Sequence, residues 1–142
     1  MLVRCLYASR AVRPLTDTVL DDILRQSRKN NPEHGVTGLL CFANAVFVQV
    51  IEGGRGEVNR LYTSIVRDAR NTGVEILAYE EIAERQFSNW TMGQVNFEAI
   101  NPAVVLKYSE KAVLDPFACT GAAMIALLHE IASSGAIANR IS

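Results

Sequence analysis

Residues 30–49 read NNPEHGVTGLLCFANAVFVQ, and this stretch carries the clearest structural pattern of the 142-residue chain. The two asparagines are followed by two runs rich in apolar, β-branched and aromatic residues, which favour β-strands. Asn44 and Ala45 lie between the runs, where the tight turn of a hairpin falls. Residues 36–52 therefore predict a β-hairpin.

The second strand of this hairpin carries a glutamine among apolar residues. Because side chains alternate between the two faces of a strand, Gln49 shares its face with Phe47 and Ile51, and we expect this face to be covered. A buried polar group without a partner costs about 1–3 kcal/mol. Gln49 and Asn31 therefore indicate a polar partner inside the domain; the alternative is an edge-strand glutamine that faces water.

The rest of the pattern extends the hairpin to an α+β domain. Residues 2–8 predict a strand, and residues 16–30 predict an amphipathic helix capped by Thr16 or Asp17. A second helix ends before Gly73, and residues 74–82 and 91–97 predict two more strands. The apolar stripe of this second helix comprises Val58, Leu61, Tyr62, Ile65 and Val66. The resulting order, βαββαββ, predicts a ferredoxin-like sheet with both helices on one face.

The C-terminal residues, 99–142, predict a helical extension. Pro102 begins a short apolar helix, and residues 121–137 predict an alanine-rich helix. Its apolar stripe comprises Met124, Leu127, Leu128 and Ile131. Since two helices on one face leave the other face of the sheet bare, we expect the extension to cover that face as a cap or to contact another subunit or a partner.

Composition argues against several classes of protein. The formal net charge is −1 and no basic stripe is present, so binding of nucleic acid through its phosphates is not supported. No apolar segment approaches the roughly 20 residues of a membrane span, and the N-terminus lacks the form of a signal peptide, which predicts a cytoplasmic protein. We expect neither a disulfide framework nor a metal site, because the possible ligands are few and widely spaced (Cys5, Cys41, Cys119, His34 and His129).

Four separated motifs carry a resemblance to a known family. They are Leu6, Tyr7 and Ser9 in the first strand, Asn31 followed by GVTG at 35–38, FVQVIEG at 47–53, and NWTM at 89–92. In this order and spacing, residues 1–98 resemble the BLUF domains, the flavin-binding sensors of blue light. LKYS at 106–109 and the terminal helix are similar to the short, stand-alone BLUF proteins of the PixD type, which carry no fused output enzyme.

The resemblance implies a noncovalently bound flavin, with FAD as the usual cofactor of the family and FMN as the alternative. An isoalloxazine ring is a flat apolar plate with one polar edge, so its pocket needs aliphatic walls and a few carboxamides. Ile23 and Ile65 on the two helices, above Phe47, would form such a slot. By their positions in the family motif, Asn31 would bond the pyrimidine edge, and Asn30 would lie toward the ribityl or diphosphate side.

The resemblance also implies which residues respond to light. Gln49 would lie between the flavin and the phenol of Tyr7, and rotation or tautomerisation of its carboxamide exchanges donor and acceptor. Tyr7 would donate an electron and a proton to the excited flavin, with Ser9 packed near the same network; the alternative is an ordinary half-buried tyrosine. Trp90 and Met92 would compete for the place beside the glutamine, and their spacing predicts that they share one side of a regular strand.

Two positions depart from the family pattern. Gly93 stands where a basic residue is common, and Ser64 stands where some relatives carry an arginine that reaches the flavin phosphate. Polar candidates for the diphosphate contact lie nearby instead, at Arg67, Asp68 and Arg70.

The predicted function is a blue-light photoreceptor and not an enzyme. It would form a homo-oligomer and signal to a separate effector, such as a response-regulator-like protein or a cyclic-dinucleotide enzyme. An acylphosphatase-like hydrolase stays open because residues 53–56 are glycine-rich and open the second helix, but no arginine lies in a tight anion-binding loop after the first strand. A flavin-free ligand-binding or protein-binding module of the same fold is the third class.

Overall fold

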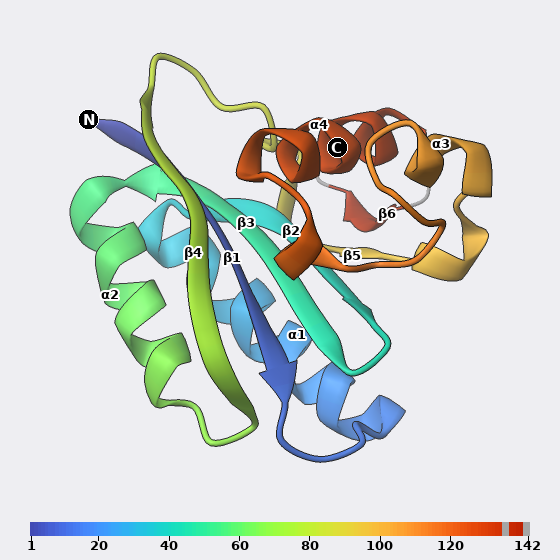
Figure 1. The fold of residues 1–142 in the computed structure, drawn as a ribbon. Helices are drawn as coiled ribbons and strands as arrows, with labels where there is room; N and C mark the ends of the chain where they lie inside the picture. Colours follow the sequence, from blue (N-terminus) through green and yellow to red (C-terminus); the bar gives the residue numbers. More distant parts are fainter. Residues whose placement is uncertain (135–136, 141–142) are drawn as a thin grey trace.

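The computed structural model describes residues 1–134 and 137–140 and contains one six-stranded sheet in the order β4-β1-β3-β2-β5-β6 (Figure 1). Only β2 and β5 pair in parallel; the other neighbouring strands are antiparallel. The strands are β1 (Leu2–Ala11), β2 (Thr37–Ala43), β3 (Val46–Gly54), β4 (Asn71–Ile82), β5 (Trp90–Val95) and β6 (Ile137–Arg140). The predicted α+β, ferredoxin-like order of elements is confirmed, and β6 adds a strand that was not predicted.

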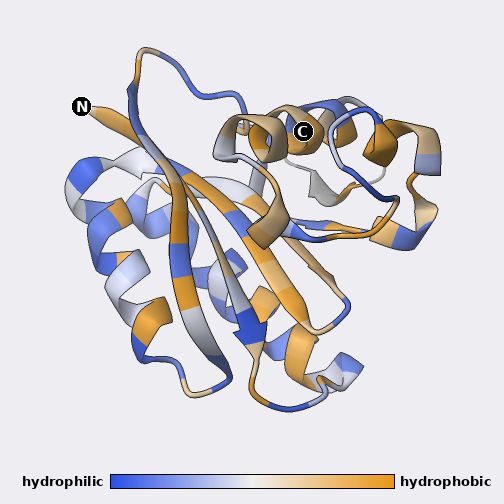
Figure 2. Ribbon diagram, viewed as in Figure 1, coloured by the Kyte–Doolittle hydropathy of each residue, from blue (hydrophilic) through white to orange (hydrophobic). Residues whose placement is uncertain are grey.

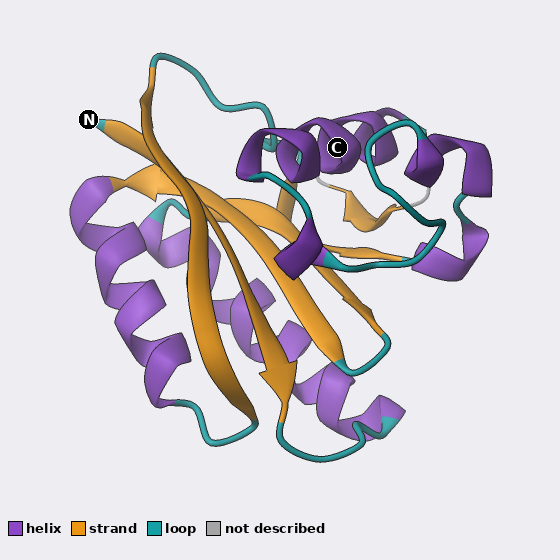
Figure 3. Ribbon diagram, viewed as in Figure 1, coloured by secondary structure: helices purple, strands orange, loops and turns teal. Residues whose placement is uncertain are grey.

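Two amphipathic helices lie along one side of the sheet (Figure 3). In α1 (Asp17–Asn30), the predicted cap is confirmed, since Thr16 accepts a hydrogen bond from the backbone N–H of Val19 at 3.3 Å. A 3-10 turn, η1 (Asn31–His34), continues α1. In α2 (Arg55–Arg67), Val58 is buried, but Val66 is exposed, so the predicted apolar stripe is one residue too wide.

The β2–β3 hairpin has the predicted turn. Asn44 and Ala45 both have positive φ, 54° and 60°, as a type I′ turn requires. This turn fixes the register, which places Gln49 directly opposite Leu40 on β2. On its other side, β3 pairs with β1, where Gln49 lies opposite Tyr7.

Each face of the sheet has its own apolar cluster, and alternating side chains supply the two clusters. The helix face lies under α1 and α2 and contains Val3, Cys5, Tyr7, Leu24, Val36, Leu40, Phe47, Ile51, Val58 and Met92. The tail face lies under the C-terminal helices and includes Leu6, Leu39, Val48, Val50, Phe87, Trp90, Val105, Met124, Leu127, Leu128 and Ile131. The C-terminal extension therefore covers the face that α1 and α2 leave bare.

The extension consists of α3 (Pro102–Leu106), the short turn η3 (Pro116–Ala118) and α4 (Gly121–Ser133). Figure 2 shows α4 as largely hydrophobic, in contrast to the mixed colouring of α2. Its first residue lies close to the sheet, since a Cβ at Gly121 would lie 2.3 Å from the carbonyl oxygen of Leu77. Glycine is therefore required at this contact.

The predicted end of the last helix, at residue 137, is wrong. Helix α4 ends at Ser133, residues 135–136 lie outside the described part of the chain, and Ile137 begins β6. The hydroxyl groups of Ser133 and Ser134 donate to the carbonyl oxygens of His129 and Ile131, respectively. Such side-chain bonds compete with the helical backbone pattern and favour a helix end. The predicted strand at 91–97 is also shifted, because Phe97 belongs to a 3-10 turn, η2 (Phe97–Ala99).

A buried ion pair on the tail face fastens the connection between β4 and β5 to the sheet. Glu52 is fully buried and lies directly opposite Arg4, with Arg4 Nη2 at 2.8 Å from Glu52 Oε2. The same carboxylate accepts the backbone N–H groups of Gln86 at 3.1 Å and Phe87 at 2.6 Å. Glu52 therefore joins two strands and the connection that leads to Trp90.

Candidate functional site

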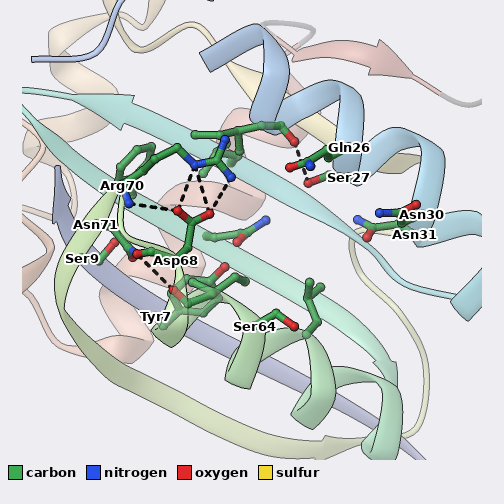
Figure 4. Close-up of a pocket in the computed structure, with 16 residues that line it drawn as sticks. Tyr7, Ser9, Gln26, Ser27, Asn30, Asn31, Ser64, Asp68, Arg70 and Asn71 are labelled. Carbon is green, nitrogen blue, oxygen red and sulfur yellow. Dashed lines mark hydrogen bonds and ion pairs between the residues drawn. The ribbon is translucent and has the colours of Figure 1, made fainter. Parts of the chain in front are cut away.

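A cavity of about 280 Å³ lies on the helix face, between α1, α2 and the sheet (Figure 4). Its apolar wall includes Ile23 and Ile65 from the two helices, and Phe47 from β3, as predicted for a slot that takes a flat ring. Polar side chains occupy its ends and floor. The lining comprises Tyr7, Ser9, Ile23, Gln26, Ser27, Asn30, Asn31, Leu40, Phe47, Gln49, Leu61, Ser64, Ile65, Asp68, Arg70 and Asn71.

Tyr7 lies on the floor of this cavity. Its hydroxyl is buried and has no hydrogen-bond partner within the described part of the chain. Burial, and then the proximity of Cys5 and Tyr62, raises the pKa of the phenol well above its ordinary value, so Tyr7 is neutral at physiological pH. The ring of Tyr62 on α2 meets the Tyr7 ring edge-on, with centroids 5.6 Å apart. A buried donor without a partner is costly, and Tyr7 is one of the residues that line the cavity.

Gln49 is the neighbour of Tyr7 across the strand pair, and its carboxamide contacts a methionine. The Nε2 group donates to Met92 Sδ at 3.1 Å, and both residues are buried. The structure therefore brings Tyr7, Gln49 and Met92 together on the helix face. Ser9 lies two residues after Tyr7 on β1 and also lines the cavity.

Trp90 does not share this side, so the prediction that Trp90 and Met92 point the same way is wrong. The indole belongs to the tail face, whereas Met92 belongs to the helix face. The register between β5 and β6 shifts between Trp90 and Gln94, which breaks the alternation of a regular strand. Gly93 makes room for the indole, because a Cβ there would lie 2.9 Å from Trp90 Cδ1.

The two asparagines lie at one end of the cavity, at the junction of α1 and η1 (Figure 4). Asn31 is buried, and its Nδ2 donates to the backbone carbonyl of Thr91 at 2.8 Å. This bond orients the carboxamide and leaves its carbonyl oxygen to accept from a ligand. Asn30 is exposed and lines the same end.

A charged pair lies at the other end (Figure 4). Asp68 and Arg70 form an ion pair through several hydrogen bonds, including Nε to Oδ1 at 2.9 Å, and the bonds from Arg70 hold the pKa of Asp68 below its ordinary value. Asn71 donates to the backbone carbonyl of Ile65 at 3.0 Å. Arg67, the third predicted candidate, is exposed and is not among the residues that line the cavity.

The sequence family model described as sensors of blue light using FAD matches residues 2–93. This chain belongs to the BLUF family. Among curated proteins, it is 34% identical over 95 residues to the beta subunit of a photoactivated adenylate cyclase of Euglena gracilis. That match covers 66% of this chain but only 11% of the cyclase subunit, so it concerns a small part of that protein.

Two solved BLUF-type structures resemble almost the whole chain. BlrB, a BLUF protein in its dark state, is 33% identical with a TM-score of 0.73, and the match covers 94% of this chain and 96% of BlrB. BlsA in its photo-activated state is 29% identical with a TM-score of 0.82, and the match covers 96% of this chain and 98% of BlsA. The match to the BLUF family favours a light sensor over the hydrolase and over the flavin-free module.

The cavity has the chemistry that a BLUF flavin needs. It combines apolar walls with carboxamides from Asn31 and Gln49, and the unpartnered phenol of Tyr7 is a donor that a bound ring system or a rotated Gln49 could satisfy. Its volume of about 280 Å³ is just below the roughly 300–1,000 Å³ typical of small-molecule pockets.

Six lining residues were not predicted: Gln26, Ser27, Leu40, Leu61, Ser64 and Asn71. Helical spacing could have found Gln26 and Ser27, since they lie three and four residues from Ile23 on the same helix. Ser64 was noted only as a departure from the family pattern. Asn71 carries no local signal, because its position depends on how the chain turns after α2.

The described residues contain neither a metal-binding cluster nor a membrane-spanning helix. Within residues 1–134 and 137–140, no group of three or more His, Cys, Asp or Glu side chains is placed to hold a metal ion. The same residues include no helix with the length and apolar character to cross a membrane.

Proposed function

We propose that this BLUF protein binds FAD noncovalently in the cavity between α1 and α2, and that Tyr7 and Gln49 are its light-responsive pair. The observation that carries the proposal is the buried, unpartnered hydroxyl of Tyr7 directly across the strand pair from Gln49, in a ligand-sized cavity. When bound, an oxidised flavin absorbs blue light and accepts an electron and a proton. The high pKa of Tyr7 matters here, because a neutral phenol that loses an electron must pass its proton to a neighbouring group.

Gln49 supplies the switch in this proposal. Its carboxamide has a donor end and an acceptor end of similar size, and the donor end is bonded to Met92 Sδ. A half-turn of the Gln49 carboxamide would point its NH2 group away from the thioether of Met92 and its carbonyl oxygen toward it. A thioether carries no hydrogen and cannot donate to that oxygen, so this hydrogen bond would be lost. Gln49 therefore has two arrangements that differ in their contact with β5, as a signal that leaves the cavity requires.

The binding residues proposed are those of the cavity. Ile23, Ile65 and Phe47 would enclose the ring, Asn31 would accept from its polar edge, and Asn30 would contact the cofactor at the same end as Asn31. Asp68 and Arg70 at the far end would meet the diphosphate side, with Arg70 as the cation. FMN stays the alternative cofactor, since its single phosphate would need only part of these contacts.

The partner and the domain division are also proposals. We infer a flavin-binding unit at residues 1–98 and a C-terminal extension at 99–142 that caps the tail face and contacts a separate effector or another copy of the chain. The extension contacts β5 directly, because its strand β6 pairs with β5. In this proposal β5 is the photoactive strand, since it carries Met92, the contact of Gln49. The cyclase relative couples light to enzyme activity in a much longer protein, and in this proposal the present chain contributes sensing and no catalysis.

We expect the purified protein to carry oxidised flavin and to show a small, reversible red shift of its absorption under blue light. The measurement is an absorption spectrum before illumination, after it, and during return in darkness, with the flavin identified chromatographically after denaturation. A protein that stays colourless and takes up neither FAD nor FMN on refolding would contradict the proposal.

We expect Asn31→Ala to weaken FAD binding by roughly 5- to 150-fold, because the loss of a hydrogen bond inside a desolvated pocket costs about 1–3 kcal/mol. FAD affinity is measured by the change in flavin fluorescence on titration of the apoprotein. Asn96→Ala is a matched control, since Asn96 is exposed and makes no side-chain cap bond. Equal affinity in the two variants would remove Asn31 from the binding set.

A further inference from the structure

Two side chains from the α1–η1 segment hold consecutive backbone carbonyls of β5. Asn31 Nδ2 donates to the Thr91 oxygen at 2.8 Å, and Arg28 Nε donates to the Met92 oxygen at 3.2 Å. Arg28 lies one helical turn before Asn31 but does not line the cavity. It therefore contacts the photoactive strand without being part of the flavin site.

The bond from Arg28 reaches the residue that Gln49 contacts. Met92 presents its thioether to Gln49 at 3.1 Å and its carbonyl oxygen to Arg28. Any shift of the β5 backbone that moves the thioether must also lengthen or replace the bond from Arg28. Arg28 thus binds the backbone of Met92, and Gln49 binds its side chain.

The surroundings of Arg28 strengthen this contact. The side chain is only partly exposed, and its Nη2 is buried and has no hydrogen-bond partner within the described residues. A charged donor in a partly desolvated place forms a stronger bond than an exposed one. The spare N–H group also allows the same guanidinium to follow the carbonyl to a second position, since Arg has five donors in a fixed fork.

We propose that Arg28 is a positioning residue for the light response: it holds the start of β5 so that the Met92 thioether stays on Gln49 in the dark. This role rests on the proposed function of Tyr7 and Gln49. Return to the dark arrangement re-forms the bond from Arg28. In this proposal the bond is already partly formed in the transition state of the return, so the guanidinium speeds recovery as well as stabilising its end point.

The test compares three variants of the flavin-loaded, full-length protein. Arg28→Met keeps most of the apolar stem and removes charge and donors, while Arg28→Lys keeps the charge with a simpler donor group. Arg25→Met is the matched control, because Arg25 lies one turn earlier on α1, is 75% exposed and forms an ion pair with Asp22 on the same helix. The readouts are the rate of dark recovery after blue light and the amide hydrogen exchange of residues 90–95 in darkness.

We expect Arg28→Met to keep the flavin and the red shift, to slow recovery at least about threefold, and to raise exchange in residues 90–95 about tenfold. Arg28→Lys should fall between this variant and the wild type, and Arg25→Met should match the wild type. Wild-type recovery and exchange in Arg28→Met would overturn the role while leaving the light response of Tyr7 and Gln49 intact. A wild-type protein that binds flavin without any spectral response would instead contradict the proposed function, and this role with it.

Discussion

Tyr7→Phe is expected to keep the flavin and abolish the red-shifted state. The substitution removes only the hydroxyl, and the remaining ring still fills the floor of the cavity and meets Tyr62 edge-on. Because the hydroxyl has no hydrogen bond to lose among residues 1–134 and 137–140, we expect the free energy of unfolding of the apoprotein to stay within about 1 kcal/mol of the wild type. A phenyl ring has no ionisable proton, so the proposed electron and proton donor is absent.

The measurement is the light-minus-dark absorption spectrum of the FAD-loaded variant. Tyr62→Phe is the matched control, since it removes the same group from the neighbouring ring on α2, and it should retain the shift. A normal photocycle in Tyr7→Phe would show that another residue donates. Loss of the shift in both variants would show that the response depends on both hydroxyl groups and not on that of Tyr7 alone.

Glu52→Ala is expected to destabilise the fold by about 3–5 kcal/mol, because it leaves the buried guanidinium of Arg4 without its main partner. The change also removes the acceptor of two backbone N–H groups, those of Gln86 and Phe87. The free energy of unfolding is measured by urea denaturation of the apoprotein. We expect the connection between β4 and β5 to lose protection from hydrogen exchange before the rest of the sheet.

Glu80→Ala provides the control for this prediction. Glu80 bonds the same guanidinium, with Arg4 Nη1 at 2.8 Å, but its side chain is 49% exposed. An exposed ion pair contributes about 0–1 kcal/mol, so the loss of Glu80 should cost much less than the loss of Glu52. Similar costs for the two variants would contradict the central role assigned to Glu52.

Much of the fold could be predicted because each regular element carries its own periodicity. The strand at residues 2–8, the capped helix at 16–30 and the hairpin with its turn at Asn44 and Ala45 all appear where the pattern predicts. The ends of elements were less accurate. Ser133 and Ser134 end α4 through side-chain bonds that hydrophobic spacing does not record.

The lining of the cavity was also largely predictable, and for a similar reason. Gln49 is a polar residue in an apolar strand, and the alternation of side chains assigns it to the same face as Phe47. The chemical roles of Tyr7, Gln49 and Asn31 came from the resemblance to BLUF domains and stay predictions. Arg28 and Asn71 had no signal, since their contacts depend on elements distant in the chain.

The order of elements, the hairpin register and the face of the sheet on which the cavity lies could all be predicted from the sequence, because they follow from local turn geometry and side-chain alternation. Three features became visible only in the folded protein: Trp90 and Met92 lie on opposite faces, Arg4 and Glu52 meet across β1 and β3, and Ile137 begins a sixth strand. The physical reason is the same for all three. Periodicity assigns a side chain to a face only while a strand stays regular. Which residues meet across strands depends on the register between segments far apart in the chain, 48 positions for Arg4 and Glu52.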